Sequence, residues 1–272
     1  MPHIDYRRQT VVVTGASSGI GTAFARALAA RGANLVLVAR RLARLTTLAD
    51  DLQTRHGTVA TAIAIDLASA TAAADLQQAL AAAGVTPTSL INNAGFGTFG
   101  SFTGESPGRL AQEIAVDVAA PVQLSSALLP SIIAADGGFL INVASMSAYA
   151  PTPRMAVYGA AKAFVLSFTE SLWAELRSSG VTVFALSPGA TSTEFNDVVG
   201  TDDATAGARM RTPEQVVATA MAHLGSRNPG PSVVDGPGNR IGAALTRLPS
   251  RRAAVTMMHR LTDPARRQRA TA

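Results

Sequence analysis

The residues best suited to chemistry in this 272-residue chain are a tyrosine and a lysine four positions apart, Tyr158 and Lys162. On a helix this spacing places both side chains on one face, within mutual reach. A phenol with a reference pKa of about 10 exchanges protons poorly near neutral pH, and a neighbouring ammonium lowers that pKa because it favours the phenolate. The pair is therefore predicted to be an acid/base centre in which Tyr158 moves the proton and Lys162 tunes it.

Lys162 is the only lysine in the sequence, since every other basic residue is an arginine. An ammonium is a compact donor that fits beneath a tyrosine and can bond a ribose hydroxyl, where the planar guanidinium fits badly. Ser145 precedes Tyr158 and directly follows an apolar run, residues 138–144. Its hydroxyl is predicted to orient a substrate oxygen, with Ser147 as the competing candidate.

Short β-branched runs alternate with longer Ala- and Leu-rich segments from residue 10 to about residue 235, a pattern typical of parallel strands joined by crossover helices. The predicted strands are residues 10–14, 34–39, 59–65, 89–92, 138–144, 181–186 and 232–234. The predicted helices are residues 20–31, 41–55, 71–83, 109–129, 156–178 and 213–224. The expected fold is α/β: a Rossmann-like, doubly wound parallel sheet of about seven strands with helices on both faces.

A glycine-rich turn follows the first predicted strand and opens the first helix. It reads Thr14-Gly15-Ala16-Ser17-Ser18-Gly19-Ile20-Gly21. Glycine permits positive φ and close approach of a pyrophosphate, and the helix N-terminus adds a partial positive charge. The turn is therefore predicted to bind a dinucleotide through Gly15, Ser17, Ser18, Gly19, Ile20 and Gly21.

The end of the second predicted strand indicates which dinucleotide. An acidic residue here would bond the ribose 2′-hydroxyl of NAD, but the chain reads Val38-Ala39-Arg40-Arg41. Arginine instead binds a 2′-phosphate through charge-assisted hydrogen bonds and can stack on adenine. NADP(H) is the predicted cofactor, with Arg40 as the principal phosphate ligand and Arg41 as a second.

Together these motifs resemble the short-chain dehydrogenase/reductase family. The resemblance rests on TGASSGIG at residues 14–21, Asn92-Asn93-Ala94-Gly95, Ser145, Tyr158-x-x-x-Lys162 and Pro188-Gly189, all in the family's order over residues 10–235. It implies that Asp66 and Leu67 contact adenine and that Asn93, Ala94 and Gly95 pass beside the adenosine ribose. It also implies that Pro188, Gly189 and Thr191 meet the nicotinamide, that residues up to about Arg211 cover the substrate, and that the protein is a homo-oligomer, a dimer or a tetramer.

One position departs from the family pattern. Asp117 stands where the family commonly has an asparagine that helps to hold a water beside the lysine. An aspartate can accept the same hydrogen bonds but cannot donate any, and if ionised it would favour the ammonium of Lys162 and weaken its effect on Tyr158. Asp117 is therefore a candidate catalytic residue, with a purely structural bond to a backbone amide as the alternative.

The formal net charge of +5 is unevenly placed. Eight arginines and Asp263 lie from Arg240 onward, so residues 240–272 are strongly basic while residues 1–239 carry a small net negative charge. The predicted division is a NADP-binding domain, 1–239, and a basic amphipathic arm, 240–272. A near-neutral body offers no footprint for nucleic acid. The i+3 spacing of three apolar residues predicts a short amphipathic helix in the arm: Val255, Met258 and Leu261. Three roles for the arm remain open: it packs on a partner subunit, it contacts anionic lipid peripherally, or it stays solvated.

The chain contains no cysteine, and its four histidines lie far apart, so no metal site is predicted. Redox chemistry must then come from a cofactor. The predicted activity is NADP(H)-dependent interconversion of a carbonyl and an alcohol, in the cytoplasm. The substrate is predicted to be an apolar small molecule, because apolar side chains are expected to line its pocket, although they could also belong to the core. These side chains are Phe96, Phe99, Met146, Met155, Phe195, Val198 and Val199. The alternative is a low-turnover NADP(H) sensor or scaffold that docks a partner or membrane through the arm.

Overall fold

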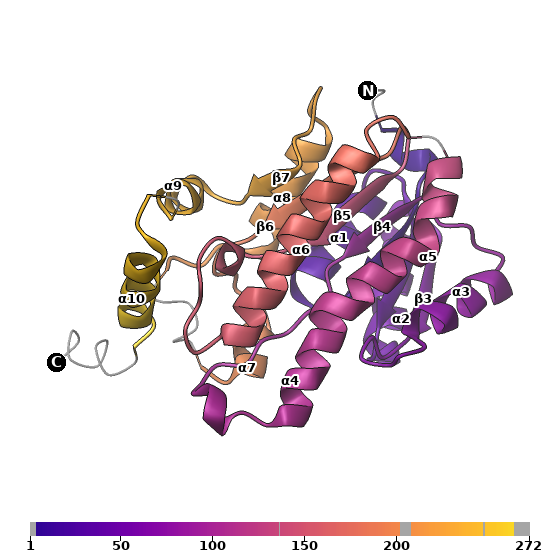
Figure 1. The fold of residues 1–272 in the computed structure, drawn as a ribbon. Coiled ribbons are helices and arrows are strands. Elements are labelled where there is room, and N and C mark those ends of the chain that lie inside the picture. The colour runs from indigo at the N-terminus through magenta and orange to yellow at the C-terminus, as the bar shows by residue number, and fades with distance from the viewer. Residues whose placement is uncertain (1–3, 136, 202–207, 247, 264–272) are drawn as a thin grey trace.

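The protein is built around one seven-stranded parallel sheet with the order β3-β2-β1-β4-β5-β6-β7 (Figure 1). The computed structural model describes residues 4–135, 137–201, 208–246 and 248–263. The strands are β1 Thr10–Thr14, β2 Asn34–Ala39, β3 Ala60–Ala64, β4 Ser89–Asn92, β5 Phe139–Val143, β6 Thr182–Ser187 and β7 Ser232–Val234. The predicted Rossmann-like fold is confirmed, and each strand lies within two residues of its predicted bounds.

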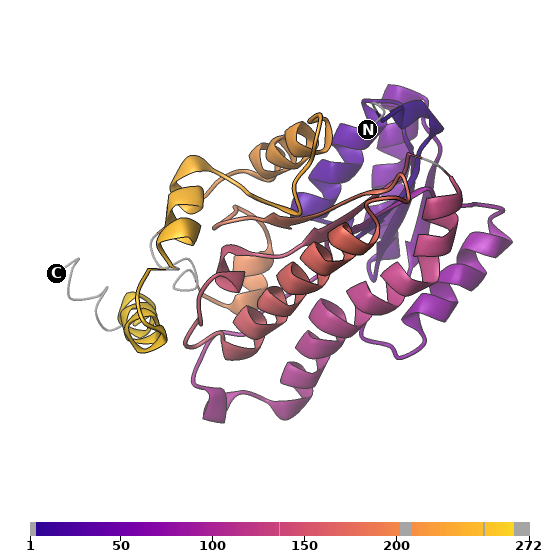
Figure 2. The same cartoon turned by 45° about the horizontal axis from the view of Figure 1, so that its top comes forward.

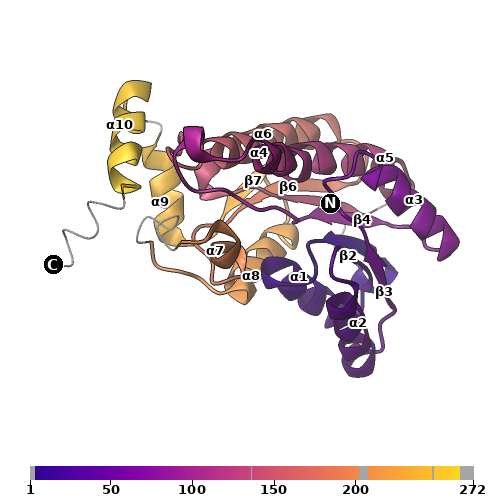
Figure 3. The ribbon, with the colours of Figure 1, turned by 90° about the horizontal axis from the view of Figure 1, so that it is seen from below.

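Helices cover both faces of the sheet, as the view from below in Figure 3 makes plain. One layer holds α1 Gly19–Ala29, α2 Leu42–His56 and α8 Pro213–Leu224; the other holds α3 Ala72–Ala82, α4 Pro107–Ile114, α5 Ala120–Ala134 and α6 Ala156–Glu175. Strand side chains alternate between the layers, so Val11 and Val13 join one buried cluster and Val12 joins the other. Both faces are therefore dry, which explains the nearly unbroken apolar strands.

Strand order reverses between β1 and β4, because the chain winds outward to β3 before crossing back. At such a switch point the loops after neighbouring strands diverge and leave a crevice at their carboxyl ends, where ligands of open α/β sheets bind. The glycine turn follows β1 and the Asn93-Ala94-Gly95 segment follows β4. The fold thus brings two of the predicted cofactor segments to the two sides of one crevice.

The helix predicted over residues 109–129 differs most from the structure. It begins earlier, at Pro107, because proline suits the first helical turn, and it continues through Pro130 to Ala134. A π-helical turn, Ala115–Ala119, interrupts it. Among the described residues Pro107–Ala134 is the one helical stretch long and apolar enough to cross a membrane, by length and composition alone. Since α5 packs on β4, β5 and α3, the same composition serves a helix of the core.

Two helices near the C-terminus, α9 Pro237–Leu245 and α10 Arg251–Leu261, lie at one end of the body (Figures 1 and 2). The amphipathic helix predicted in the arm is present as α10, but its expected apolar stripe is not the packing face. Val255 and Leu261 are 40% and 51% exposed, whereas Ala254 and Thr262 are buried. The predicted domain boundary at residue 239 falls inside α9, which was not predicted, and neither was α7, Phe195–Val199. The two-part division stays a prediction.

Candidate active site

The glycine turn after β1 forms a cradle that has no room for side chains. Gly15 and Gly19 have φ of 65° and 54°, which glycine adopts without strain. A Cβ on Gly15 would lie 2.8 Å from Asn93 Nδ2, and a Cβ on Gly21 would collide with the carbonyl oxygen of Gly15. Ile20, partly buried, opens α1 directly behind the turn. The glycines thus expose the backbone of the turn at a helix N-terminus, which fits a pyrophosphate.

Hydrogen bonds fix the segment after β4 against this turn. Thr14 Oγ1 accepts from the amides of Asn93, at 2.9 Å, and Ala94, at 3.1 Å, while Asn93 Nδ2 donates to the Thr14 carbonyl at 2.9 Å. The predicted neighbours of the adenosine ribose are therefore held rigidly beside the cradle. Beyond β3, Leu67 is buried and Asp66 is exposed, with Oδ1 accepting the amide of Ala68 at 3.0 Å. Asp66 is thus a turn-forming residue in this structure, and its contact with adenine stays a prediction.

The two predicted phosphate-binding arginines have different surroundings. Arg40 is exposed, whereas Arg41 donates to Ser17 Oγ at 3.0 Å and to Ser18 Oγ at 3.1 Å. Arg41 is therefore already placed on the glycine turn. It also pairs with Glu194 at 2.8 Å. The same carboxylate binds Arg44 at 2.5 Å, so the hydrogen bonds of Arg44 and Arg41 lower the pKa of Glu194 to about 2.

At the reacting end, Tyr158 and Lys162 lie on one face of α6, as predicted. Lys162 Nζ is 5.6 Å from the centre of the Tyr158 ring and donates to the Val143 carbonyl at 3.2 Å. Ser145 Oγ accepts the amide of Ser147 at 3.1 Å, which caps the short helical turn after β5. Ser147 therefore supports Ser145 through its backbone. Ser145, Tyr158 and Lys162 come together at the carboxyl edge of the sheet.

The acidity of this group follows from burial and charge. Burial raises the pKa of the Tyr158 phenol, and the Lys162 ammonium and a hydrogen bond with Ser145 only partly oppose that rise. Burial disfavours the charged form of Lys162, but the charges of Asp117 and Tyr158 outweigh it and raise its pKa. The sequence predicted that Lys162 lowers the pKa of Tyr158. Its charge has that effect, but burial has a larger one, so the pKa of Tyr158 lies above its ordinary value. Burial thus favours the protonated phenol of Tyr158, and the neighbouring negative charges favour the ammonium form of Lys162.

Asp117 lies inside the π-helical turn, buried against this pair. Its Oδ2 is 3.2 Å from Lys162 Nζ, and its Oδ1 accepts the amide of Phe96 at 3.0 Å. A Cβ on Gly95 would lie 2.9 Å from Lys162 Nζ and 3.0 Å from Asp117 Oδ1, so only glycine lets the chain pass here. Burial raises the pKa of the Asp117 carboxyl, against the pull of Lys162 and the Phe96 amide. The aspartate thus makes the predicted backbone bond and an ion pair as well.

A second buried carboxylate was not predicted from the sequence. Glu113 lies one turn before Asp117, is fully buried, and accepts from Thr98 Oγ1 at 2.9 Å. The four-residue spacing to Asp117, on one helix face, was the available signal. Asp117 accepts a hydrogen bond from the Phe96 amide and Glu113 accepts one from Thr98, so the residues on both sides of Gly97 are held in place. A Cβ added to Gly97 would lie 3.2 Å from Tyr158 Cδ2. Segment 96–98 therefore forms a fixed wall against the tyrosine ring.

Glu113 makes the stability of the protein depend on pH. Burial, the largest cause, raises its pKa from 4.5 to about 7. Because the folded pKa is the higher one, its contribution to stability is complete below pH 4.5 and is lost as the pH rises to about 7. We expect Glu113→Gln, which keeps an acceptor for Thr98, to be more stable than the wild type at pH 8 by about 3 kcal/mol. Urea unfolding at pH 4.5 and pH 8 measures the difference.

The matched control for this prediction is Glu175→Gln, since Glu175 is exposed at the end of α6. Its stability should follow the wild type at both pH values. Equal stabilities of Glu113→Gln and the wild type at pH 8 would contradict the raised pKa.

The segment after β6 carries the residues predicted at the nicotinamide. The Pro188 carbonyl accepts the amide of Met146 at 2.9 Å, and Thr191 Oγ1 donates to the Gly189 carbonyl at 3.0 Å. A Cβ on Gly189 would collide with Asn239 of α9. Pro188 thus lies beside the segment that follows Ser145, and Asn239 of α9 packs on Gly189.

Apolar side chains surround Tyr158 in part as predicted. The ring of Phe195 is 5.3 Å from that of Tyr158, and Met155 is buried close by. Phe96, Phe99 and Met146 are partly buried, as is Val199. Val198 is 48% exposed. The reacting end therefore has an apolar rim made chiefly by Phe195 and Met155.

The arm reaches this rim through Arg154, the only non-glycine residue of positive φ in the part of the chain that is described. Arg154 donates to the carbonyl of His259 and to Thr262 Oγ1, both at 3.2 Å, and pairs with Asp263 at 3.5 Å. Its own carbonyl accepts the amide of Gly100 at 2.9 Å. Arg154 thus ties the C-terminal end of α10 to the loop that leads into Tyr158.

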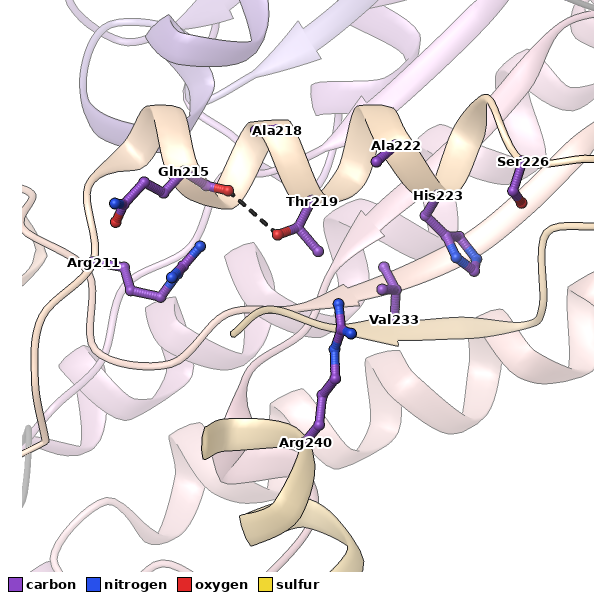
Figure 4. Close-up of a pocket in the computed structure, with 9 residues that line it drawn as sticks. All are labelled: Arg211, Gln215, Ala218, Thr219, Ala222, His223, Ser226, Val233 and Arg240. Atoms are coloured by element: carbon purple, nitrogen blue, oxygen red, sulfur yellow. Dashed lines mark hydrogen bonds between the residues drawn. The ribbon is translucent and has the colours of Figure 1, made fainter. Parts of the chain in front are cut away.

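A separate hollow of about 540 Å³ lies between α8 and β7 (Figure 4). Its lining residues are Arg211, Gln215, Ala218, Thr219, Ala222, His223, Ser226, Val233 and Arg240. Only Arg211 was named from the sequence, as the approximate end of the segment expected to cover the substrate. Arg211 pairs with the buried Asp235 at 2.6 Å, and Thr219 Oγ1 donates to the same carboxylate at 2.6 Å. Asp235 therefore ties α8 to the end of β7. No group of three or more potential metal-ligating side chains occurs within the described ranges.

Comparison with known proteins agrees with this geometry. A family model of short chain dehydrogenases matches residues 9–204. A short chain dehydrogenase of Pseudocercospora fijiensis is 38% identical over 190 residues, which are 69% of this chain and 61% of that protein. A sulfoacetaldehyde reductase of Chromohalobacter salexigens is 36% identical over 216 residues, 78% of this chain and 84% of that protein.

Among solved structures, a short-chain dehydrogenase from Sphingobium yanoikuyae in complex with NADPH has a TM-score of 0.78. It is 32% identical in sequence, and the match covers 92% of this chain and 95% of that one. The family match covers most of the described body, from β1 past β6. The chain therefore belongs to the short-chain dehydrogenase/reductase family of oxidoreductases.

Proposed function

We propose that the protein is an NADP(H)-dependent oxidoreductase that interconverts a carbonyl and an alcohol. The observation that carries this proposal is the grouping of Ser145, Tyr158 and Lys162 at the carboxyl edge of the sheet, beside the glycine cradle. When bound, the nicotinamide would supply or accept the hydride at the carbon atom. Tyr158 then supplies or accepts the proton at the oxygen. Hydride and proton together account for the C–H and O–H bonds that form in reduction and break in oxidation.

The chain's own residues divide this task. Ser145 holds the substrate oxygen and donates to the phenol or accepts from it. Lys162 stabilises the phenolate that remains after Tyr158 has given up its proton, and its ammonium would bond the nicotinamide ribose. Burial raises the pKa of Tyr158, and the protonated phenol is the form that can give a proton to the carbonyl oxygen in reduction.

Preference for NADP(H) is supported by three arginines and by the absence of an acid at the end of β2. Arg40 and Arg41 follow β2, and Arg44 lies one turn further along α2. The similar protein of Sphingobium yanoikuyae was solved with NADPH. A 2′-phosphate would accept charge-assisted hydrogen bonds from these guanidinium groups, whereas the 2′-hydroxyl of NAD offers them no charge.

The test is a fluorescence titration with NADPH and NADH, followed by turnover of a panel of ketones and aldehydes at 340 nm. We expect tighter binding of NADPH and a loss of that preference in Arg40→Asp. An NAD preference in the wild type, or an unchanged preference in Arg40→Asp, would reject the cofactor assignment. Tight binding with no turnover across the panel would instead favour the sensor or scaffold.

Three further features belong to the same proposal. The substrate is an apolar carbonyl compound, because Phe195 and Met155 form the rim around Tyr158. The protein is a homo-oligomer through its α5 and α6 faces, where Phe164 is 43% exposed and stacks on Phe168 at 5.9 Å. It acts in the cytoplasm. The contacts of Arg154 favour an arm that packs on its own chain over one that docks a partner subunit or anionic lipid.

Asp117 is proposed to regulate the acidity of Tyr158. Its negative charge raises the pKa of the phenol, so Asp117→Asn should lower that pKa and shift the rising limb of the pH profile for alcohol oxidation toward lower pH. The asparagine carbonyl still accepts the Phe96 amide, which keeps the wall in place. The pH profile of kcat/KM measures the shift. An unchanged rate and profile would remove Asp117 from any direct catalytic role.

A further inference from the structure

The segment Thr193–Phe195 touches both ends of the site. The methyl carbon of Thr193 is 2.9 Å from the position that a Cβ on Gly19 would take, so the segment covers the glycine turn. Glu194 binds Arg41 and Arg44, and Phe195 packs on the ring of Tyr158. Three consecutive residues therefore contact the phosphate cradle, the arginine cluster and the acid/base tyrosine.

The Glu194 carboxylate lies between two arginines as a bound phosphate would. Arg41 and Arg44 belong to the start of α2, about 150 residues away in sequence, and both direct a guanidinium nitrogen at the one carboxylate. Arg41 holds Ser17 and Ser18 of the glycine turn with its remaining donors. Planar guanidinium groups that converge in this way bind carboxylate and phosphate oxygens with the same geometry.

We propose that Glu194 is an internal competitor for the 2′-phosphate of the cofactor, which must replace it on Arg41 and Arg44 and so releases the segment that carries Phe195. The inference rests on the proposed use of NADP(H). A cofactor without the 2′-phosphate leaves the Glu194 carboxylate in place. Glu194 thereby links recognition of the phosphate to the covering of Tyr158.

The size of the effect follows from the exposure of the partners. Glu194 is 40% exposed and its arginines are 43% and 51% exposed, so water and salt screen both pairs. Two exposed pairs of this kind support an effect of about three- to tenfold on affinity. The competition should weaken at high salt, because the pairs lie at the surface.

Adenosine 2′,5′-bisphosphate and 5′-AMP are suitable probes, because they differ only in the 2′-phosphate. We expect Glu194→Gln to bind the bisphosphate about three- to tenfold more tightly than the wild type and 5′-AMP equally well, by isothermal titration calorimetry. Asp197→Asn is the matched control: it removes one negative charge from exposed Asp197 in the same segment and should change neither affinity. In an Arg41→Ala, Arg44→Ala background the effect of Glu194→Gln should vanish.

Release of the segment Thr193–Phe195 can be measured separately from binding. Chymotryptic cleavage after Phe195, mapped by mass spectrometry, should quicken in the wild type with the bisphosphate but not with 5′-AMP, and should be fast in Glu194→Gln without ligand. Unchanged or weaker binding of the bisphosphate by Glu194→Gln overturns the competition, and an unchanged cleavage rate overturns the release. If the wild type binds 5′-AMP as tightly as the bisphosphate, the proposed cofactor is wrong. That outcome is therefore distinct from failure of the inference alone.

Discussion

Replacing Tyr158 by phenylalanine is expected to lower kcat for carbonyl reduction by about a thousandfold, within the range that general acid catalysis contributes. Only the hydroxyl is lost, so the ring keeps its contact with Phe195 and the wall at Gly97. The dissociation constant for NADPH should stay within about twofold of the wild type, because the glycine cradle and the arginines are untouched. Steady-state kinetics and fluorescence titration of the same preparations measure both quantities.

Tyr149→Phe is the matched control for this variant. Tyr149 lies in the loop after β5, near the site, and its hydroxyl is 3.4 Å from Ser187 Oγ, away from the Lys162 ammonium. We expect its turnover to stay near that of the wild type. If Tyr158→Phe retained most of its turnover while Tyr149→Phe lost it, the acid would have to be reassigned.

The sequence was sufficient to predict the sheet and the residues at its carboxyl edge. Apolar β-branched runs give strands in any doubly wound fold, and loops after parallel strands must emerge at one edge. Ser145, Tyr158 and Lys162 are also close in sequence, within one strand, one loop and one helix. Their proximity is therefore largely local. The glycine turn is local as well, because its shape follows from the φ values that only glycine adopts easily.

The contacts that were not predicted join distant parts of the chain. Glu194 meets Arg44 across about 150 residues, and Arg154 meets Thr262 across about 110. Neither pairing leaves a periodic pattern in the sequence, because each joins single residues that lie in different elements or loops. Glu113 was not predicted for another reason: an acid in a helix is usually solvated, whereas Glu113 is buried and bonds Thr98.

The π-helical turn that carries Asp117 was not predicted from the sequence. A regular helix over residues 109–129 carries each side chain round by 100°, whereas one widened turn shifts every later residue. Asp117 lies within the widened turn and is buried there, where it reaches both Phe96 and Lys162. An interruption of this kind is common at functional sites.

Replacing Lys162 by methionine should separate the structural and chemical roles of that ion pair. The variant leaves Asp117 buried without its cation, which typically costs about 3–5 kcal/mol and would lower Tm by about 5–10 °C. Because the pKa of an unpaired buried carboxyl rises, the lost stability should return as the pH falls and Asp117 is protonated. Turnover should be lost at every pH, since no ammonium remains to stabilise the phenolate.

Adding Asp117→Asn to Lys162→Met removes the buried charge and keeps the acceptor for the Phe96 amide. The double variant should therefore recover most of the lost Tm without recovering turnover, and its stability should no longer improve at low pH. Thermal unfolding at pH 5 and pH 8, with turnover measured on the same samples, gives both results. Recovery of turnover together with Tm would mean that Lys162 only holds the fold, because a neutral pair cannot stabilise a phenolate.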